Sequence, residues 1–195
     1  MNPSTTVRRI GADEAYGCVE ALADVLIDCV EGGASVSFML PLARSTALAF
    51  WRGVADGVVR GERVLVVAED EQGRIVGTVQ LITAQPENQP HRADVAKMLV
   101  RRSARRRGVA LQLMAALDAA ALEAGKTVLV LDTVTGGDAE CLYARAGWQR
   151  VGVVPNFALM PTGELCATTF FYKHLGVGPR PPSDRMTTCP PPPAG

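Results

Sequence analysis

The chain has 195 residues, of which 48% are hydrophobic, so it can bury the core of one domain. Twenty basic and twenty acidic residues give no net charge, which argues against a general attraction to nucleic acid or to an anionic membrane. The five cysteines are scattered without a CxxC pair and there are two histidines, so a metal site is not expected.

The first half of the chain predicts two helices followed by a group of strands. We expect a strand over residues 6–10 and a helix that Asp13 caps and Gly32 ends. A second amphipathic helix over 42–59 precedes a hairpin of strands 64–68 and 75–82, and a further strand covers 92–100.

The second half predicts alternating helices and strands. A helix follows Gly108, and the apolar run 127–131 indicates a central strand covered on both faces. A short helix over 138–145 precedes strands 148–154 and 168–173, with residues 155–164 as a loop. The order βααβββαβαββ predicts an α/β fold, a mixed sheet flanked by helices.

Neither a membrane span nor a signal peptide is expected. No apolar run approaches ~18 residues, and residues 1–9 are polar. Together with the scattered, odd number of cysteines, this favours the reducing environment of the cytoplasm. Residues 1–176 are expected to form the domain. The proline-rich residues 177–195 are expected to be a flexible extension outside the domain.

A basic turn between a strand and a helix is the most informative segment. Residues 98–111 read MLVRRSARRRGVAL, where free amides at the helix start, small residues and arginines would suit a phosphate or diphosphate. The motif is neither the GxGxxG fingerprint of dinucleotide-binding folds nor the GxxxxGK[ST] motif of P-loop NTPases, so it supports neither of these classes. A solvated basic turn stays open as an alternative. An RNA-binding patch is disfavoured because no aromatic residues accompany the arginines.

The turn Arg105–Ala110 resembles the GNAT acetyltransferase signature Gln/Arg-x-x-Gly-x-Gly/Ala, and residues 139–148 resemble the family's Ala-x-x-x-Tyr-x-x-x-Gly-Phe segment. The resemblance spans residues 6–175 and implies a GNAT fold, with a twisted mixed sheet between helices, that binds acetyl-CoA. It implies that the cofactor is held by Met98, Leu99, Val100, Arg105, Arg106, Arg107, Gly108, Val109, Ala110 and Leu111. Gly136 stands where the family often has an asparagine, so one side-chain contact to the cofactor is either missing or supplied by Asp138.

Acetyl transfer to an amine needs a base, because an ammonium ion has no lone pair and an alkylamine has a pKa near ~10. Asp94 and Asp132 are the candidate bases. Asp94 could also be a plain strand residue, and Asp132 a cap for the following helix. The resemblance implies that Tyr143 protonates the leaving thiolate. Core packing is the alternative role for this tyrosine. An acetyl-cysteine route through Cys141 or Cys166 is disfavoured because neither has a nearby histidine in the sequence.

Within the superfamily the chain resembles the tabtoxin-resistance type of acetyltransferase, through residues 31–39, 131–133 and 170–176. This resemblance implies a small amine acceptor, either a tabtoxin-like toxin or an aminoglycoside such as kasugamycin, and hence antibiotic resistance. The acceptor is expected to contact Glu31, Phe38, Asp94, Asp132 and Phe157, with Glu164 as a further acidic group. A peptide or protein N-terminal acetyltransferase and a non-catalytic acetyl-CoA sensor are the alternatives. Dimers are common in the family, so a homodimer is a candidate assembly.

Overall fold

The computed structural model describes residues 5–176, so the proline-rich residues 177–195 lie outside the described part. Its elements follow the predicted order: β1 (Thr6–Ile10), a 3-10 turn η1 (Ala15–Cys18), α1 (Val19–Glu31), α2 (Arg44–Val59), β2 (Arg63–Glu69), β3 (Ile75–Ile82), β4 (Arg92–Val100), a 3-10 turn η2 (Arg102–Ala104), α3 (Val109–Glu123), β5 (Val128–Val134), α4 (Asp138–Arg145), β6 (Gln149–Leu159) and β7 (Leu165–His174). Within this part, no helix has the length and apolar character to cross a membrane.

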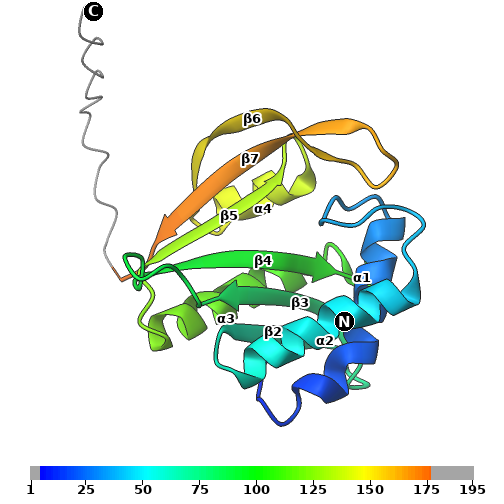
Figure 1. Ribbon diagram of the computed structural model, residues 1–195, viewed down its shortest axis with the longest axis horizontal. Coiled ribbons are helices and arrows are strands. Elements are labelled where there is room, and N and C mark those ends of the chain that lie inside the picture. Colours follow the sequence, from blue (N-terminus) through cyan, green and yellow to red (C-terminus); the bar gives the residue numbers. More distant parts are fainter. Residues whose placement is uncertain (1–4, 177–195) are drawn as a thin grey trace, which may run out of the picture.

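The strands form one seven-stranded mixed sheet in the order β1-β2-β3-β4-β5-β7-β6, which confirms the predicted fold class (Figure 1). β4 and β5 pair in parallel, and the other neighbouring strands pair antiparallel. The parallel pair lies in the middle of the sheet, where the chain crosses over through α3. Ligands of open α/β sheets bind outside the carboxyl ends of the strands, where the order of the strands switches direction.

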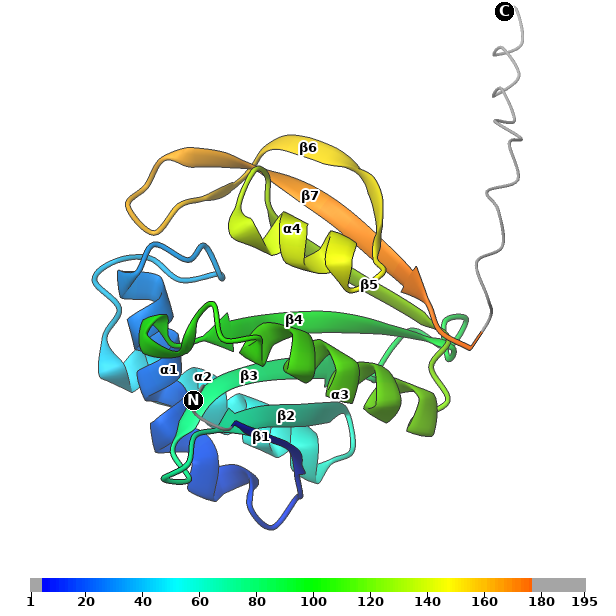
Figure 2. The same ribbon diagram turned by 180° about the vertical axis from the view of Figure 1, so that it is seen from behind.

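Helices cover both faces of the sheet, α1 and α2 on one face and α3 on the other (Figures 1 and 2). The side chains of β2 alternate between the two faces. Val64, Val66 and Ala68 pack in the core that contains α3, while Leu65 and Val67 pack against α1 and α2. Because both faces are covered, β2 is apolar along nearly its whole length.

The structure corrects three predicted boundaries. Asp13 does not cap α1, because a 3-10 turn intervenes and α1 begins only at Val19. β5 continues to Val134, so Asp132 lies inside the strand. β6 runs to Leu159, whereas residues 155–164 were expected to form a loop. The pairing of β6 with β7 is interrupted between Val154 and Ala158, and this irregularity accommodates a proline that the sequence signals as a strand breaker.

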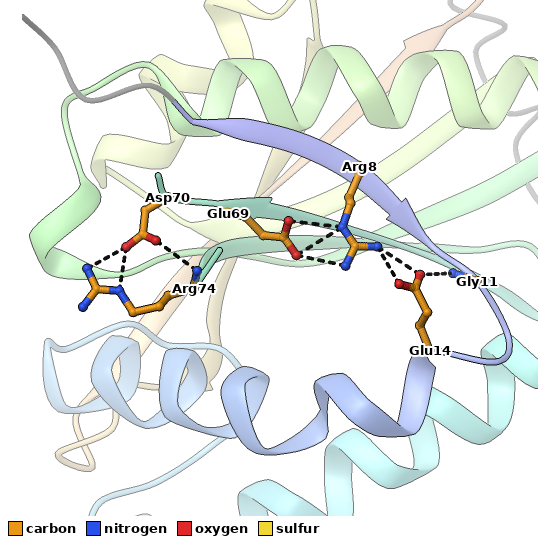
Figure 3. A network of polar contacts seen from close by, with 6 residues as sticks. All are labelled: Arg8, Gly11, Glu14, Glu69, Asp70 and Arg74. Atoms are coloured by element: carbon orange, nitrogen blue, oxygen red, sulfur yellow. Dashed lines mark hydrogen bonds and ion pairs between the residues drawn. The ribbon is translucent and has the colours of Figure 1, made fainter. Parts of the chain in front are cut away.

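Arg8 on the edge strand β1 forms ion pairs with β2 and with the segment before η1, and another ion pair lies at the β2–β3 turn (Figure 3). The guanidinium of Arg8 donates to Glu69 at the end of β2, and also to Glu14 before the 3-10 turn, both at 2.9 Å. Asp70 accepts from Arg74 across the hairpin turn of β2 and β3, which lowers the pKa of this carboxyl. Ion pairs at the protein surface contribute only about 0–1 kcal/mol each, so these pairs add little to the stability of the sheet.

Candidate active site

The strands β4 and β5 separate soon after they begin. Their parallel pairing covers Arg92 to Asp94 on β4 and Val128 to Val130 on β5, and it stops there. β4 then stays paired with β3, while β5 follows β7. Figure 1 shows the resulting split in the sheet, with β5, β7 and β6 turned away from β4. The second half of β4 therefore has one edge without a neighbouring strand, and this edge can accept a ligand.

A cavity of about 700 Å³ lies at this split. Its walls come from the segment after α1, from the middle of β4, from the end of β5, from the start of α4 and from the β6–β7 hairpin. Residues whose side chains can do chemistry there are Lys97, Arg105, Asp132, Asp138 and Tyr143. Its size is in the range of small-molecule sites.

Two segments distant in sequence are joined by hydrogen bonds beside the cavity. The hydroxyl of Ser35 donates to the carbonyl of Leu159 at 2.8 Å, and the amide of Leu40 donates to the carbonyl of Pro161 at 2.9 Å. The first residue of each pair belongs to the segment between α1 and α2, and the second to the β6–β7 hairpin (Figure 1). These bonds bridge the two halves of the split sheet.

The turn before α3 presents a row of free backbone amides. Arg106 and Gly108 both have positive φ angles, 61° and 81°, and the first helical bond of α3 is donated by Gln112 to the carbonyl of Gly108. Within residues 5–176, the amides of residues 106–111 have no hydrogen-bond acceptor. Together with the positive end of the helix dipole, they form a cradle for an anion.

The three arginines of this turn lie differently. Arg105 lines the cavity, and its Nε donates to the carbonyl of Val100 at 3.1 Å. Arg106 and Arg107 are exposed to solvent, and in the described chain neither side chain forms an ion pair. Arg105 thus helps to fix the turn, while the other two remain available to a phosphate.

Tyr143 projects from α4 to the cavity. The residue is 5% exposed. Its ring packs edge-on against Trp148, with centroids 6.0 Å apart, and at a tilt against Phe171, with centroids 5.7 Å apart. Burial, reinforced by the charge of Asp132, raises the pKa of Tyr143 to about 12. The hydroxyl has no hydrogen-bond partner among the described residues and stays protonated at neutral pH.

Asp132 lines the same cavity from β5, where it pairs in register with Phe170. The carboxyl is open to the cavity, but the surrounding protein removes much of its water and so raises its pKa. Lys97 opposes this shift and Asp94 adds to it. The N-cap of α4 is Gly137, and no side chain caps this helix. Asp132 is therefore not the helix cap that the sequence left open as its alternative role.

Known proteins are similar to this chain in both sequence and structure. A family model described as an acetyltransferase (GNAT) domain matches residues 60–150. An uncharacterised N-acetyltransferase from the hisH–hisA intergenic region of Azospirillum brasilense is 33% identical over 129 residues, which cover 65% of this chain and 74% of the relative. The chain belongs to the GNAT family. It is an acetyl-CoA-dependent N-acetyltransferase, as the signature at Arg105–Ala110 led us to expect.

Solved GNAT structures have the same fold. A phosphinothricin acetyltransferase from Sinorhizobium meliloti, solved with acetyl-CoA, is 17% identical with a TM-score of 0.71, and the match covers 96% of this chain and 97% of that one. A ribosomal-protein-alanine N-acetyltransferase from Brucella melitensis is 23% identical with a TM-score of 0.69, covering 87% and 99%. Proteins named for a small-molecule acceptor and proteins named for a protein acceptor therefore share the GNAT fold.

Several residues that were expected to bind the cofactor are also buried in the core or hydrogen-bonded within the protein. Leu99 is buried and pairs with Thr78, and Val109, the first residue of α3, is also buried, so only their main-chain groups could reach a ligand. The carbonyl of Val100 already accepts from Arg105 and from the thiol of Cys29. Met98 lines the cavity, whereas Leu111 is exposed.

Asp138 is the first residue of α4, and it lines the cavity. An acidic side chain at a helix start is favourable whether or not a ligand is present, so its position alone does not assign it to the cofactor. The neighbouring Gly136, where GNAT enzymes often have an asparagine, donates its amide to Glu140 at 3.0 Å.

Asp94 lies beside the cavity but does not line it. Its carboxylate forms an ion pair with Arg92 and accepts from the side-chain amide of Gln85 at 3.0 Å. It still acts on the site at a distance, because its negative charge contributes to the raised pKa of Asp132.

The remaining expected acceptor residues divide into aromatic and acidic groups. Phe38 and Phe157 both line the cavity. Glu31 lies outside the lining, with its carboxylate 3.7 Å from Arg102, and Glu164 accepts from Thr162 at the hairpin turn. The structure therefore brings the two aromatic residues to the cavity and leaves the two glutamates outside it.

Lys97 is a cavity residue that the sequence analysis missed. It lies in the middle of β4 with a φ of 52° and donates from Nζ to the hydroxyl of Ser37 at 3.1 Å. The signal was present in the sequence, because a lysine interrupts the apolar run of a central strand, where charged residues are rare.

Proposed function

We propose that this GNAT enzyme acetylates the primary amine of a small molecule, by direct attack of the amine on acetyl-CoA in a ternary complex. A tabtoxin-like toxin and an aminoglycoside such as kasugamycin are the proposed acceptor types, and their acetylation would give resistance. The observation that carries the proposal is that Asp132 and Tyr143 line one cavity at the split between β4 and β5.

The residues present fit acetyl-CoA. The free amides of residues 106–111 suit its diphosphate, and Arg106 and Arg107 can add charge-assisted hydrogen bonds. The unpaired edge of β4 beyond Asp94 can bond the amide groups of the pantetheine arm. When bound, the cofactor supplies an acetyl group activated as a thioester.

Asp132 is the proposed general base. It takes a proton from the acceptor's ammonium group, directly or through one water, and so frees the nitrogen lone pair. The neutral nitrogen then attacks the thioester carbon and becomes positively charged. As the adduct collapses, the carbon–sulfur bond breaks, its electron pair leaves with the sulfur, and the nitrogen loses its second proton to water. A main-chain amide near Leu99 is the proposed donor to the developing negative oxygen.

Tyr143 is the proposed general acid, which gives its hydroxyl proton to the departing thiolate. Burial keeps this hydroxyl protonated at neutral pH, so its proton is present when the thiolate departs, and water returns the proton after each turnover. Asp94 is proposed as an electrostatic helper that keeps Asp132 more basic. The pair of acid and base in one cavity argues against a sensor that binds acetyl-CoA without catalysis.

The hydrogen bonds between the segment after α1 and the β6–β7 hairpin favour a small acceptor over a protein N-terminus. A polypeptide acceptor needs a groove along which the chain can continue. Here the bonds Ser35–Leu159 and Leu40–Pro161 bridge the space between the segment after α1 and the hairpin.

The deciding experiment follows thiol release from acetyl-CoA with panels of amino acids, small amines, aminoglycosides and short peptides. A reaction without acceptor corrects for hydrolysis and for the exposed thiol of Cys141. We expect thiol release with one class of small amine. Turnover only with peptides bearing a free N-terminus would contradict the proposal, and so would acetyl-CoA binding without turnover on any acceptor.

A further inference from the structure

Lys97 is aimed into the cavity by an irregularity in β4. Thr78 pairs with Leu99 and Gln80 pairs with Ala96, so Lys97 and Met98 together oppose the single residue between the two β3 partners. This is a β-bulge, and the positive φ of Lys97 lies within it. Bulges of this kind redirect a side chain, and a non-glycine residue with positive φ is uncommon. The backbone thus carries a local cost at the position of this lysine.

The ammonium group of Lys97 is held by neutral partners. It donates to the hydroxyl of Ser37, and it lies 5.9 Å from the ring centroid of Phe38 and 5.5 Å from that of Phe50. Within residues 5–176, no carboxylate lies at ion-pair distance from it. Asp132, across the cavity, affects Lys97 only through longer-range attraction.

A cation in this position is only partly compensated. Its surroundings take away water, which lowers the pKa of the Lys97 ammonium group, and aromatic faces and one hydroxyl replace only part of the lost hydration. A negatively charged group entering the cavity would therefore gain more from Lys97 than it would from a solvated surface lysine.

The acidic groups that would suit a polycationic acceptor are engaged elsewhere. Glu31 faces Arg102, Asp94 is paired with Arg92, and Glu164 bonds within the hairpin. Besides Lys97 and Arg105, the charged side chains that line the cavity are Asp132 and Asp138. Of these four, only Lys97 on β4 and Asp132 on β5 belong to the two strands of the split, and an ammonium facing a carboxylate across it matches an acceptor carrying both charges.

We propose that the acceptor is a small amine that also carries an acidic group, and that Lys97 binds this group while Asp132 faces the amine. This inference rests on the proposed function and names its substrate class. Lys97 acts here as a specificity residue. An alternative role, in which a neutral Lys97 itself removes the amine proton, predicts a loss of rate with every acceptor and so is separated by the same test.

The test compares matched pairs of acceptors that differ only in the acidic group. L-Amino acids are compared with the corresponding carboxamides, and 4-aminobutyrate with n-butylamine, by kcat/KM for thiol release and by calorimetric binding to the enzyme loaded with coenzyme A. The variants are Lys97→Met, which keeps the length of the side chain, and Lys97→Arg, which keeps the charge. Arg60→Met, which removes an exposed cation paired with Glu62, is the control.

We expect the wild type to prefer the acidic member of at least one pair by tenfold or more. Measured above the acidic limb of the pH profile, Lys97→Met should abolish this preference through KM with little change for the neutral member. Lys97→Arg should keep part of the preference, and Arg60→Met should keep all of it. Equal or better use of the neutral members, or an unchanged preference in Lys97→Met, would overturn the inference while leaving acetyl transfer intact. A similar loss with both members in Lys97→Met would assign the lysine to the chemistry and also overturn it. No binding and no turnover with any amine would overturn the proposed function as well.

Discussion

Lys97 and Asp132 line one cavity from β4 and β5, two strands that pair only as far as Asp94 and Val130. They form no ion pair, yet each affects the charge of the other: Lys97 lowers the pKa of Asp132, and Asp132 raises that of Lys97. The space between them is left open for an acceptor. Because the two groups are coupled, changing one should alter the titration of the other.

The pH profile of Lys97→Met should move to higher pH. Burial raises the pKa of Asp132 and Lys97 holds that rise in check, so removing the ammonium group leaves a less acidic carboxyl. The proposed base works only when ionised, and the acidic limb of kcat follows its pKa in the complex. Measured with a neutral amine, this limb should shift upward in Lys97→Met and stay in place in Arg60→Met. A shift to lower pH would contradict the coupling.

Asp132→Asn should remove the base without removing the cavity. At neutral pH we expect kcat to fall by about 10²- to 10⁴-fold. The remaining rate should rise about tenfold for each pH unit, until the pKa of the amine near ~10 is reached, because solution then supplies the neutral amine. The measurement is a rate profile from pH 6 to 10. A loss that is the same at every pH would indicate a structural role for Asp132.

Tyr143→Phe should lower turnover at least tenfold and leave the affinity for acetyl-CoA nearly unchanged. The substitution keeps the ring that packs against Trp148 and Phe171 and removes only the hydroxyl. Tyr172→Phe is the matched control, since its hydroxyl bonds to Gln149 outside the cavity lining. Steady-state rates and calorimetric binding of acetyl-CoA provide the two readouts. Equal rates in the two variants would remove Tyr143 from the acid role.

Gly108→Ala should weaken binding of coenzyme A by about tenfold, or ~1.4 kcal/mol. Gly108 has a φ of 81°, and a Cβ atom added to it would meet no other atom within 4 Å, so the new methyl group would occupy open space beside the free amides. Gly73→Ala is the control, because Gly73 has a φ of 72° and similar free space in the β2–β3 turn. Both variants should lose comparable stability in urea unfolding. Equal affinity for coenzyme A in the two would contradict a phosphate site at Gly108.

Local sequence patterns were sufficient for the order of elements and for the sheet. A few adjacent residues are enough to predict the strands β2 and β5, which are apolar runs, and the basic turn before α3. The extent of β6 could not be read in this way. Its continuation past Pro155 depends on pairing between Ala158 and Cys166 of β7, a contact across the hairpin that no local pattern contains.

The candidate site was predictable where one side chain and one motif suffice, as at Tyr143 and the turn Arg105–Ala110. The site was not predictable where a charged side chain pairs with a residue from a distant segment of the chain. Glu31 was expected to face the acceptor, but Arg102 of the η2 turn lies closer to it. Lys97 enters the cavity because of a bulge in β4, and bulges depend on the pairing of two strands rather than on one residue.

The most direct measurement is a crystal structure of the enzyme with coenzyme A and an acceptor analogue. We expect the diphosphate on the amides of residues 106–111, the pantetheine arm along the unpaired edge of β4 and the sulfur beside the hydroxyl of Tyr143, with Asp132 facing the acceptor. A diphosphate bound elsewhere, or a sulfur remote from both Tyr143 and Asp132, would contradict this assignment of the active site.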